Sequence, residues 1–222
     1  MASGLWPPFD GAFPGGPVTT LSKLRALHGR LEACRRCPKM IRPVVHGAAV
    51  DSQVFLLVQA PGIREGPAGR PFAWTAGKTL FGWFHEAVGV DEPVIRERVY
   101  FAAVARCFPG KAKTGGGDRK PDDGEVLACR PWLEAEVQLL KPKLVLPVGA
   151  LAITQVLGHT GPLAEVIGTT HETTWHGVKV EVIPLPHPSG ASTWHRVQPG
   201  KALLAKALKL LSRHEVLRAA VR

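Results

Sequence analysis

Hydrophobic residues along this chain gather in four short, nearly continuous runs rich in β-branched side chains. The runs cover residues 54–58, 99–105, 144–150 and 178–185. A continuous apolar run of this length is typical of a strand buried on both faces of a parallel sheet, because a strand with one solvated face alternates apolar and polar positions. The pattern therefore predicts four strands at these positions.

The segments between these runs have the spacing of amphipathic helices. The first helix begins near Thr19 or Thr20 and places a series of leucines, from Leu21 to Leu31, on one face. Strand and helix alternate from there on, which predicts an α/β fold with a parallel sheet between helices. Further helical patterns cover residues 76–89, 125–141 and 150–158, and a basic helix covers 201–221.

Two segments lack any apolar periodicity. Residues 1–18 are rich in glycine, proline and aromatic residues, so we interpret them as an irregular arm whose aromatic side chains dock on a single domain formed by residues 19–222. Residues 109–124 combine glycines, prolines and charges. This composition predicts a long exposed loop, and loops of this length are often functional.

Composition excludes several classes of protein. The chain has 222 residues, of which 45% are hydrophobic, and its mean hydropathy is +0.04. These values exclude wholesale disorder, and no apolar run is long enough to span a bilayer. The first residues lack the basic start and continuous apolar core of a secretory signal, so we expect a cytoplasmic protein without a membrane partner.

The net charge indicates a polyanionic partner. The chain carries 28 Lys and Arg against 18 Asp and Glu, a formal charge of +10. Basic side chains that neutralise phosphates release condensed counterions, so nucleic acid is the first candidate. A solvated basic surface without a polyanionic partner is the alternative, because the basic residues are spread along the whole chain.

Four cysteines form a pattern typical of metal ligation. Cys34 and Cys37 make a C-x-x-C pair, while Cys107 and Cys129 lie far along the chain with 21 residues between them. Without a secretion signal, metal binding is favoured over disulfides. Four thiolates suit zinc or a [4Fe-4S] cluster, and the wide spacing of the second pair favours the cluster. Alternatively, Cys107 and Cys129 are simply small buried residues.

Unusual residues follow three of the predicted strands. QAPG (59–62) and GRPF (69–72) come after the first run, Ala103 and Cys107 lie at the end of the second, and HPSG (187–190) follows the fourth. Ligands of open parallel sheets bind at the carboxyl ends of the strands. We therefore expect these segments to form one site.

The ordered combination of these motifs, with the PKLVLPVGALA segment at 142–152, resembles the iron-sulfur uracil-DNA glycosylases, between the family 4 and family 5 types. The resemblance extends from about Leu21 to Leu211. It implies a three-layer αβα fold with a central four-stranded parallel sheet and one structural [4Fe-4S] cluster held by the four cysteines. The implied activity is monofunctional hydrolysis of uracil, and of other deaminated bases, from DNA in base excision repair, which leaves an abasic site.

The resemblance also assigns roles to individual residues. Phe72 matches the aromatic on which the flipped base stacks, with Ala60 and Gly62 beside it, and His187 matches the histidine that donates a hydrogen bond to uracil O2 as the base departs. Alternatively, Phe72 is a core aromatic next to a turn and His187 is a surface turn residue. The segment after His187 is either an ordinary surface loop or part of the DNA-binding surface. The residues implied in DNA binding are Ser189, Gly190, Ala191, Ser192 and Arg196.

Two departures from the family pattern affect the chemistry. Ala103 replaces an Asn of the uracil-selective branch, so we predict a base range broader than uracil. Thr75 replaces an Asp of the broader-specificity branch, and position 60 also lacks a carboxylate. Gln59 and Thr75 then become the candidates for positioning the catalytic water, with Glu65 in reserve.

Two rival functions remain open at this point. A catalytically weak or silent family member would bind uracil-containing or abasic DNA through the same pocket. An iron-sulfur electron-transfer or sensor protein would use only the cysteines. We expect a monomer that acts on DNA.

Overall fold

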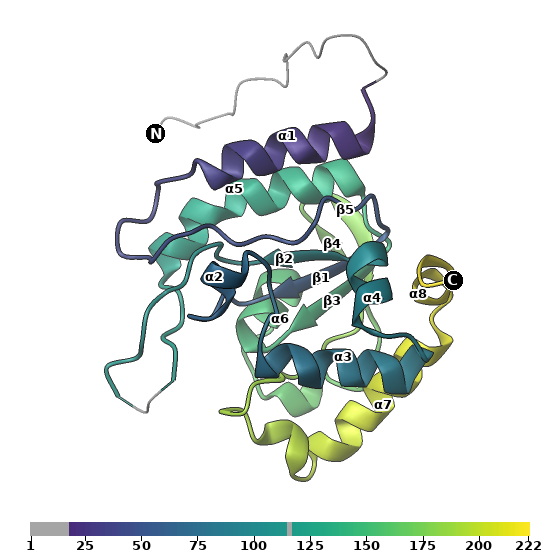
Figure 1. The fold of residues 1–222 in the computed structure, drawn as a ribbon. Coiled ribbons are helices and arrows are strands. Elements are labelled where there is room, and N and C mark those ends of the chain that lie inside the picture. Colours follow the sequence, from purple (N-terminus) through teal and green to yellow (C-terminus); the bar gives the residue numbers. More distant parts are fainter. Residues whose placement is uncertain (1–17, 115–116) are drawn as a thin grey trace.

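A computed structural model describes residues 18–114 and 117–222 of the chain (Figure 1). The arm whose aromatic residues are predicted to dock on the domain lies almost wholly outside the described residues. Within them, strands and helices alternate around one central sheet, as the hydrophobic pattern predicts.

The sheet has five strands in the order β2-β1-β3-β5-β4. The strands are β1 (Val54–Val58), β2 (Tyr100–Ala103), β3 (Leu144–Val148), β4 (His171–Trp175) and β5 (Val178–Val182). The neighbours β2, β1, β3 and β5 pair in parallel. Every residue of β1, β2 and β3 is buried, as predicted for continuous apolar runs, whereas β5 alternates between exposed and more buried residues and is not covered on both faces.

The prediction of a four-stranded sheet is wrong by one strand, because β4 pairs antiparallel with β5 at one edge. Residues His176 and Gly177 join the two strands in a tight turn with φ values of 46° and 78°, the left-handed conformation that short hairpin turns require. The sequence of β4, HETTW, is mostly polar and half exposed. It therefore has no apolar run for the pattern to detect.

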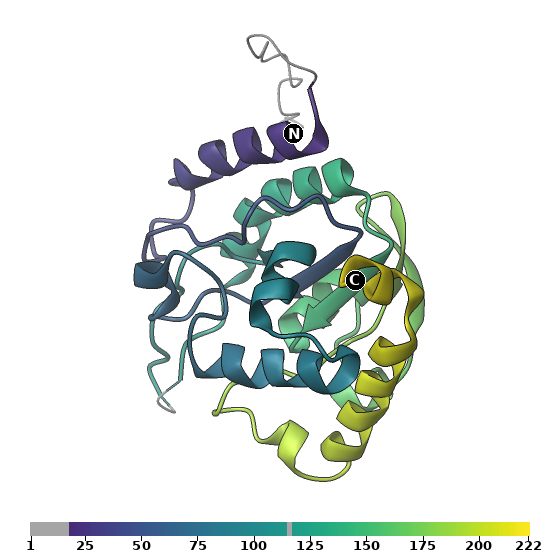
Figure 2. The ribbon, with the colours of Figure 1, turned by 45° about the vertical axis from the view of Figure 1, so that its right-hand side comes forward.

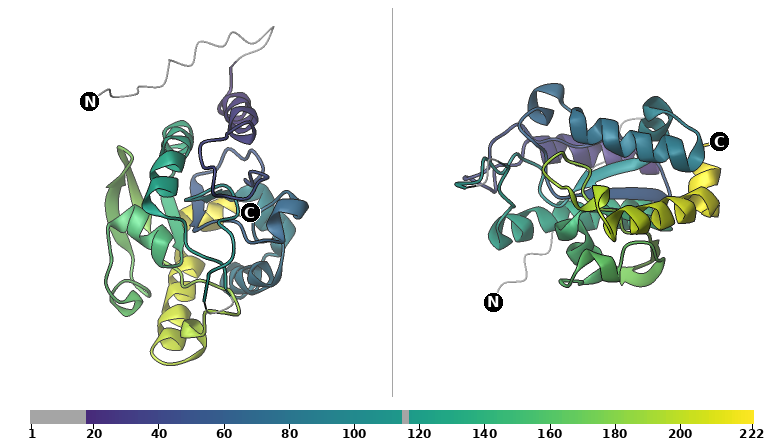
Figure 3. Two further views of the ribbon diagram at one scale, coloured as in Figure 1. Left: turned by 90° about the vertical axis from the view of Figure 1, so that its left-hand side faces the viewer. Right: turned by 90° about the horizontal axis from the view of Figure 1, so that it is seen from below.

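Helices cover both faces of the sheet, which makes three layers (Figures 1 and 3). On one face, α1 (Thr20–Glu32) packs against α5 (Asp123–Leu140). On the other, α3 (Thr75–Val88) packs against α7 (Gly200–Arg213). The helix α6 (Ala150–Leu157) follows β3 directly and contacts β1, β3 and β4. The two faces of the sheet carry separate hydrophobic cores.

Side-chain caps explain where two of these helices begin. Thr19 Oγ1 accepts a 3.1 Å hydrogen bond from the Ser22 amide, so α1 starts where its Thr signal indicates. At α5, Asp122 and Glu125 form a reciprocal capping box, with hydrogen bonds of 2.8 and 2.9 Å. This box ends the polar loop of residues 109–124.

Several short elements were not predicted. The helices α2 (Glu65–Ala68) and α4 (Glu92–Arg98) lie between β1 and β2. The predicted C-terminal helix over 201–221 is interrupted, because His214 has an extended backbone and divides α7 from α8 (Glu215–Ala220) (Figure 2). No helix of the described residues is long and apolar enough to cross a membrane.

Candidate active site and cysteine cavity

A cavity of about 730 Å³ opens at the carboxyl ends of β1, β3 and β5. Its walls come from the segment after β1, the start of α3, the β3–α6 junction, the polar loop before α5 and the loop that follows β5. This is the position that the topology of an open parallel sheet favours for a ligand. The predicted strand-end motifs thus meet in one place.

Most of the residues predicted for catalysis and binding line this cavity. They are Gln59, Ala60, Gly62, Phe72, Thr75, His187, Ser189, Ala191 and Ser192. Three predicted residues are not part of the lining. Ala103 is buried in the same hydrophobic core as Phe72, Gly190 lies in the loop after His187, and Arg196 lies in a short 3-10 helix (Trp194–Arg196).

Backbone pairing and a glycine fix the place of His187. Beyond β5 the chain continues alongside β3, and the Gly149 amide donates a 2.9 Å hydrogen bond to the Leu185 carbonyl. Gly149 has a φ of +87°, and a Cβ there would lie 3.1 Å from His187 Cδ2. The imidazole therefore packs directly on the backbone at the end of β3, an approach that requires glycine.

The surroundings of His187 also determine its protonation. The Ser189 amide donates a 3.3 Å hydrogen bond to His187 Nδ1, so this nitrogen is an acceptor and the proton resides on Nε2. Burial lowers the pKa of His187, and the nearby His195 lowers it further. The site thus holds a neutral imidazole with an Nε2–H donor.

Phe72 has a strained backbone that its neighbours stabilise. Its φ is +55°, in the left-handed region that bulky residues avoid, and the residue is only 4% exposed. Arg96 donates 3.0 Å hydrogen bonds to the carbonyl oxygens of Pro71 and Phe72. A Cβ at Gly77 would lie 1.9 Å from the Phe72 oxygen, so α3 can approach this turn only at a glycine.

Glu65 also lines the cavity, and its carboxylate joins the two motifs that follow β1. The Gly62 amide donates a 2.8 Å hydrogen bond to Glu65 Oε2. Burial raises the pKa of this carboxyl, while backbone hydrogen bonds from Gly62, Phe72 and Ala73 act in the opposite direction. The carboxylate is therefore positioned to hold the QAPG segment against the turn at Phe72.

The polar loop contributes cavity residues that the motifs did not reveal. Lys111, Asp118 and Lys120 all line the cavity, and Lys111 Nζ lies 2.7 Å from Asp118 Oδ1. The composition of residues 109–124 predicted a functional loop, but it did not indicate which side chains reach the site. Trp74 and Arg64 also line the cavity. The sequence did not predict them as site residues, because neither lies within one of the strand-end motifs.

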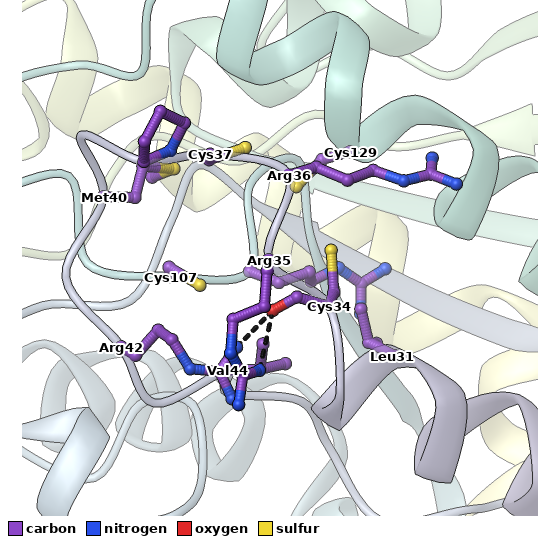
Figure 4. Close-up of a pocket in the computed structure, with 12 residues that line it drawn as sticks. Leu31, Cys34, Arg35, Arg36, Cys37, Met40, Arg42, Val44, Cys107 and Cys129 are labelled. Atoms are coloured by element: carbon purple, nitrogen blue, oxygen red, sulfur yellow. Dashed lines mark hydrogen bonds between the residues drawn. The ribbon is translucent and has the colours of Figure 1, made fainter.

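The four cysteines surround a second cavity of about 240 Å³ (Figure 4). Cys34 and Cys37 follow α1, Cys107 follows β2, and Cys129 lies in α5. Helix packing of α1 on α5 brings these distant segments together. The predicted convergence of the four thiols is therefore present.

The thiols lie close to one another, with Cys129 buried and the other three cysteines half-buried. Burial and the neighbouring thiols raise the pKa of Cys37 to about 12, and burial and Cys129 together raise that of Cys107 to about 11. Such thiols stay protonated unless a cationic centre stabilises their thiolates. Among the described residues, no group of three or more His, Cys, Asp or Glu is spaced to hold a single metal ion.

Cationic side chains surround the cysteine cavity. Arg106 is 1% exposed and forms a buried ion pair with Glu136, and within the described chain its Nε and Nη1 have no hydrogen-bond partner. Buried N–H groups without partners are rare, and these belong to a residue that lines the cavity. The other arginines of the lining are Arg35, Arg36 and Arg42.

Comparisons with known proteins agree with this geometry. Residues 44–212 match the model of the uracil DNA glycosylase superfamily. The chain is 26% identical to a type-4 uracil-DNA glycosylase of Saccharolobus solfataricus, over 77% of this chain and 78% of the relative. It is 31% identical to the type-4 enzyme of Pyrobaculum aerophilum, over 75% and 83%.

A type-5 uracil-DNA glycosylase of Thermus thermophilus is 32% identical over 60% of this chain and 62% of that protein. The relatives thus include both type-4 and type-5 enzymes, the two types that the motifs of this sequence resemble. With three quarters of its length matched by one family model, the chain belongs to the uracil DNA glycosylase superfamily.

Proposed function

We propose that this protein removes uracil from DNA by hydrolysis of the N-glycosyl bond in base excision repair. The observation that carries the proposal is the neutral His187, whose Nδ1 accepts from the Ser189 amide in a cavity that also contains Phe72. The names of the relatives support uracil as the base. The net charge of +10 suits a polyanionic substrate.

The cavity provides what the departing base needs. A flipped base enters at the strand ends and stacks on Phe72, because the sugar bond is inaccessible inside a duplex. The Nε2–H of His187 then donates to O2 as negative charge develops on the base. A donor of this kind is worth about 3 to 4 kcal/mol of barrier. The neutral imidazole can donate this hydrogen bond from Nε2–H without first taking up a proton.

Water is positioned by polar groups in this proposal. Gln59 and Thr75 line the cavity and present an amide and a hydroxyl. The two carboxylates of the lining are already engaged, Glu65 by the Gly62 amide and Asp118 by Lys111. Because an oxocarbenium-like sugar needs little activation of its nucleophile, orienting water is sufficient.

The proposal includes a monofunctional mechanism, which requires that the sugar is not attacked by any lysine of the cavity. Lys111 and Lys120 both line it, and a lysine amine that attacked the sugar would form a Schiff base. Lys111 is held in an ion pair with Asp118. We expect neither amine to act as a nucleophile.

We further propose that Cys34, Cys37, Cys107 and Cys129 hold one [4Fe-4S] cluster. Four thiolates around a cluster carry net negative charge, which the surrounding arginines and the free N–H groups of Arg106 are suited to stabilise. When bound, the cluster cross-links the end of α1 to α5 and to the segment after β2. Its role in this proposal is structural.

The base range is proposed to extend to other deaminated bases such as hypoxanthine. Ala103, at the end of β2, has no polar side-chain atoms that could hydrogen-bond to the edge of a base, and it does not line the cavity. Discrimination then depends on stacking and on the stability of the leaving base more than on a buried hydrogen-bonding side chain. Cleavage of matched duplexes carrying uracil or hypoxanthine, by the parent and by Ala103→Asn, tests this point.

The decisive experiment is incubation of the purified protein with labelled oligonucleotides that carry one uracil, or thymine as control. We expect strand breaks at uracil only after alkali treatment, and no product that borohydride traps. Breaks without alkali would overturn the monofunctional mechanism. Tight binding to uracil-containing DNA without base release would identify a silent family member instead.

A further inference from the structure

Trp74 occupies a position that neither helix capping nor core packing explains. It is the N-cap residue of α3 and makes no side-chain capping hydrogen bond, although Ser, Thr, Asp and Asn are the residues that stabilise this position. Its side chain is 57% exposed, whereas the other tryptophans of the described residues are buried or half-buried. A large aromatic that the fold does not require indicates a binding role.

The surroundings of Trp74 indicate what it binds. Trp74 lines the mouth of the large cavity, two residues beyond the buried Phe72. The guanidinium of Arg64 lies 5.2 Å from the centroid of the indole ring, and Arg64 lines the same cavity. Lys120 adds positive charge to the lining, while Lys111 is paired with Asp118. One aromatic residue thus lies inside the cavity and a second lies at its entrance beside a cation.

We propose that Trp74 and Arg64 form a subsite for the nucleotide next to the extruded one, with Trp74 stacking on its unpaired base and Arg64 near its phosphate. This inference rests on the proposed function, since it takes the cavity to hold a flipped nucleotide. Stacking on an indole ring suits any base, so the subsite adds affinity for single-stranded DNA without reading sequence.

The test compares Trp74→Ser and Trp74→Phe with the parent protein. Serine is a good N-cap, so Trp74→Ser preserves or stabilises α3 while it removes the ring. The ligand is a DNA oligonucleotide with one abasic-site analogue, used as a single strand and as a duplex in which every other base is paired. Leu127→Ala is the control, because it removes an exposed apolar side chain, 64% exposed, from α5.

We expect Trp74→Ser to weaken binding of the single strand about 5- to 150-fold and binding of the duplex much less, since the neighbouring base stays paired there. Trp74→Phe should retain most of the affinity, and Leu127→Ala should match the parent. Unchanged binding by Trp74→Ser, an equal loss on both ligands, or no recovery in Trp74→Phe would overturn the proposal. Binding is measured without cleavage, so failure to release uracil would count against the proposed function alone.

Discussion

Arg96 donates a hydrogen bond to the carbonyl oxygen of Phe72, and its second terminal nitrogen donates to Pro71, both at 3.0 Å. The same guanidinium lies 4.6 Å from the centre of the Phe81 ring and pairs with Glu92 at 2.7 Å. A residue of α4 therefore holds the turn that presents the stacking aromatic. This contact compensates the left-handed backbone of Phe72.

Replacement of Arg96 by Lys should lower the single-turnover rate of base release about 10- to 100-fold, because lysine lacks the rigid planar fork with which the guanidinium reaches both carbonyl groups, and small displacements of a binding group are costly. Glu92→Gln is the matched control, since it removes the ion pair but leaves both carbonyl hydrogen bonds. Rates measured at saturating protein check this. Equal rates in parent and Arg96→Lys would show that Phe72 keeps its position unaided.

Gly149→Ala should lower the rate of base release by folded protein, beyond any effect on the stability of the fold. The added Cβ would lie 3.1 Å from His187 and would displace its ring. Gly158→Ala is the control, because Gly158 also has a positive φ, +69°, but a Cβ there meets nothing within 4 Å. Gly158→Ala should lose about 1 kcal/mol of stability from its left-handed backbone, and Gly149→Ala about 1 to 3 kcal/mol, because a ψ of 162° places Gly149 in a region that is almost restricted to glycine. Only Gly149→Ala should lose activity in rate assays on folded protein.

His187→Ala should lower the single-turnover rate about 100- to 1000-fold and change DNA affinity little, because its hydrogen bond strengthens only as charge develops on the base. Rate and affinity are measured separately on the same uracil-containing duplex. If affinity collapses while the rate at saturation stays the same, His187 is a binding residue and the assignment is wrong.

The purified protein should be brown and contain about four irons per chain. Cys129→Ala and Cys34→Ala should lose iron and lower the melting temperature, while folded protein keeps most of its rate of base release, since the cluster joins segments distant in sequence. Metal analysis and thermal unfolding check this. One zinc and no iron, or a stable but inactive cysteine variant, would contradict the proposed structural cluster.

Stability should fall in mild acid because of His28. This residue is buried, and its Nε2 lies 2.9 Å from the Tyr100 hydroxyl. Burial, with the charges of His46 and Arg106, lowers its pKa from 6.5 to about 3. Below the ordinary pKa the unfolded chain binds a proton that the folded chain does not, so acid favours unfolding.

The expected loss is about 1.4 kcal/mol per pH unit below 6.5, or about 2 kcal/mol by pH 5. His28→Gln keeps a hydrogen-bonding group but cannot titrate, and its stability should fall less steeply. Denaturant unfolding of both proteins at pH 7.5 and pH 5 measures the difference. Identical slopes would show that His28 does not control the acid response.

The hydrophobic pattern was sufficient to locate the buried strands, because a strand covered on both faces consists of consecutive apolar residues. It missed β4, whose polar residues pair with β5 at an edge, and it missed the break at His214, where neither proline nor glycine marks the end of a helix. In both cases tertiary contacts decide the structure, and local sequence contains little signal of them.

For the site, strand-end motifs located Phe72 and His187 because topology brings such ends together. The supporting residues were not predictable in this way. Arg96 and Gly149 act through backbone contacts between segments far apart in the chain, and Lys111 and Asp118 reach the cavity from a loop whose path no periodicity describes.

The edge strand β4 also affects how molecules meet one another. Its exposed side includes Glu172, which lies opposite Glu181 in the register with β5. A strand from a second molecule that added to this edge would approach a row of polar and acidic side chains, and desolvating them is unfavourable. The hairpin thereby protects this edge of the sheet from edge-to-edge aggregation.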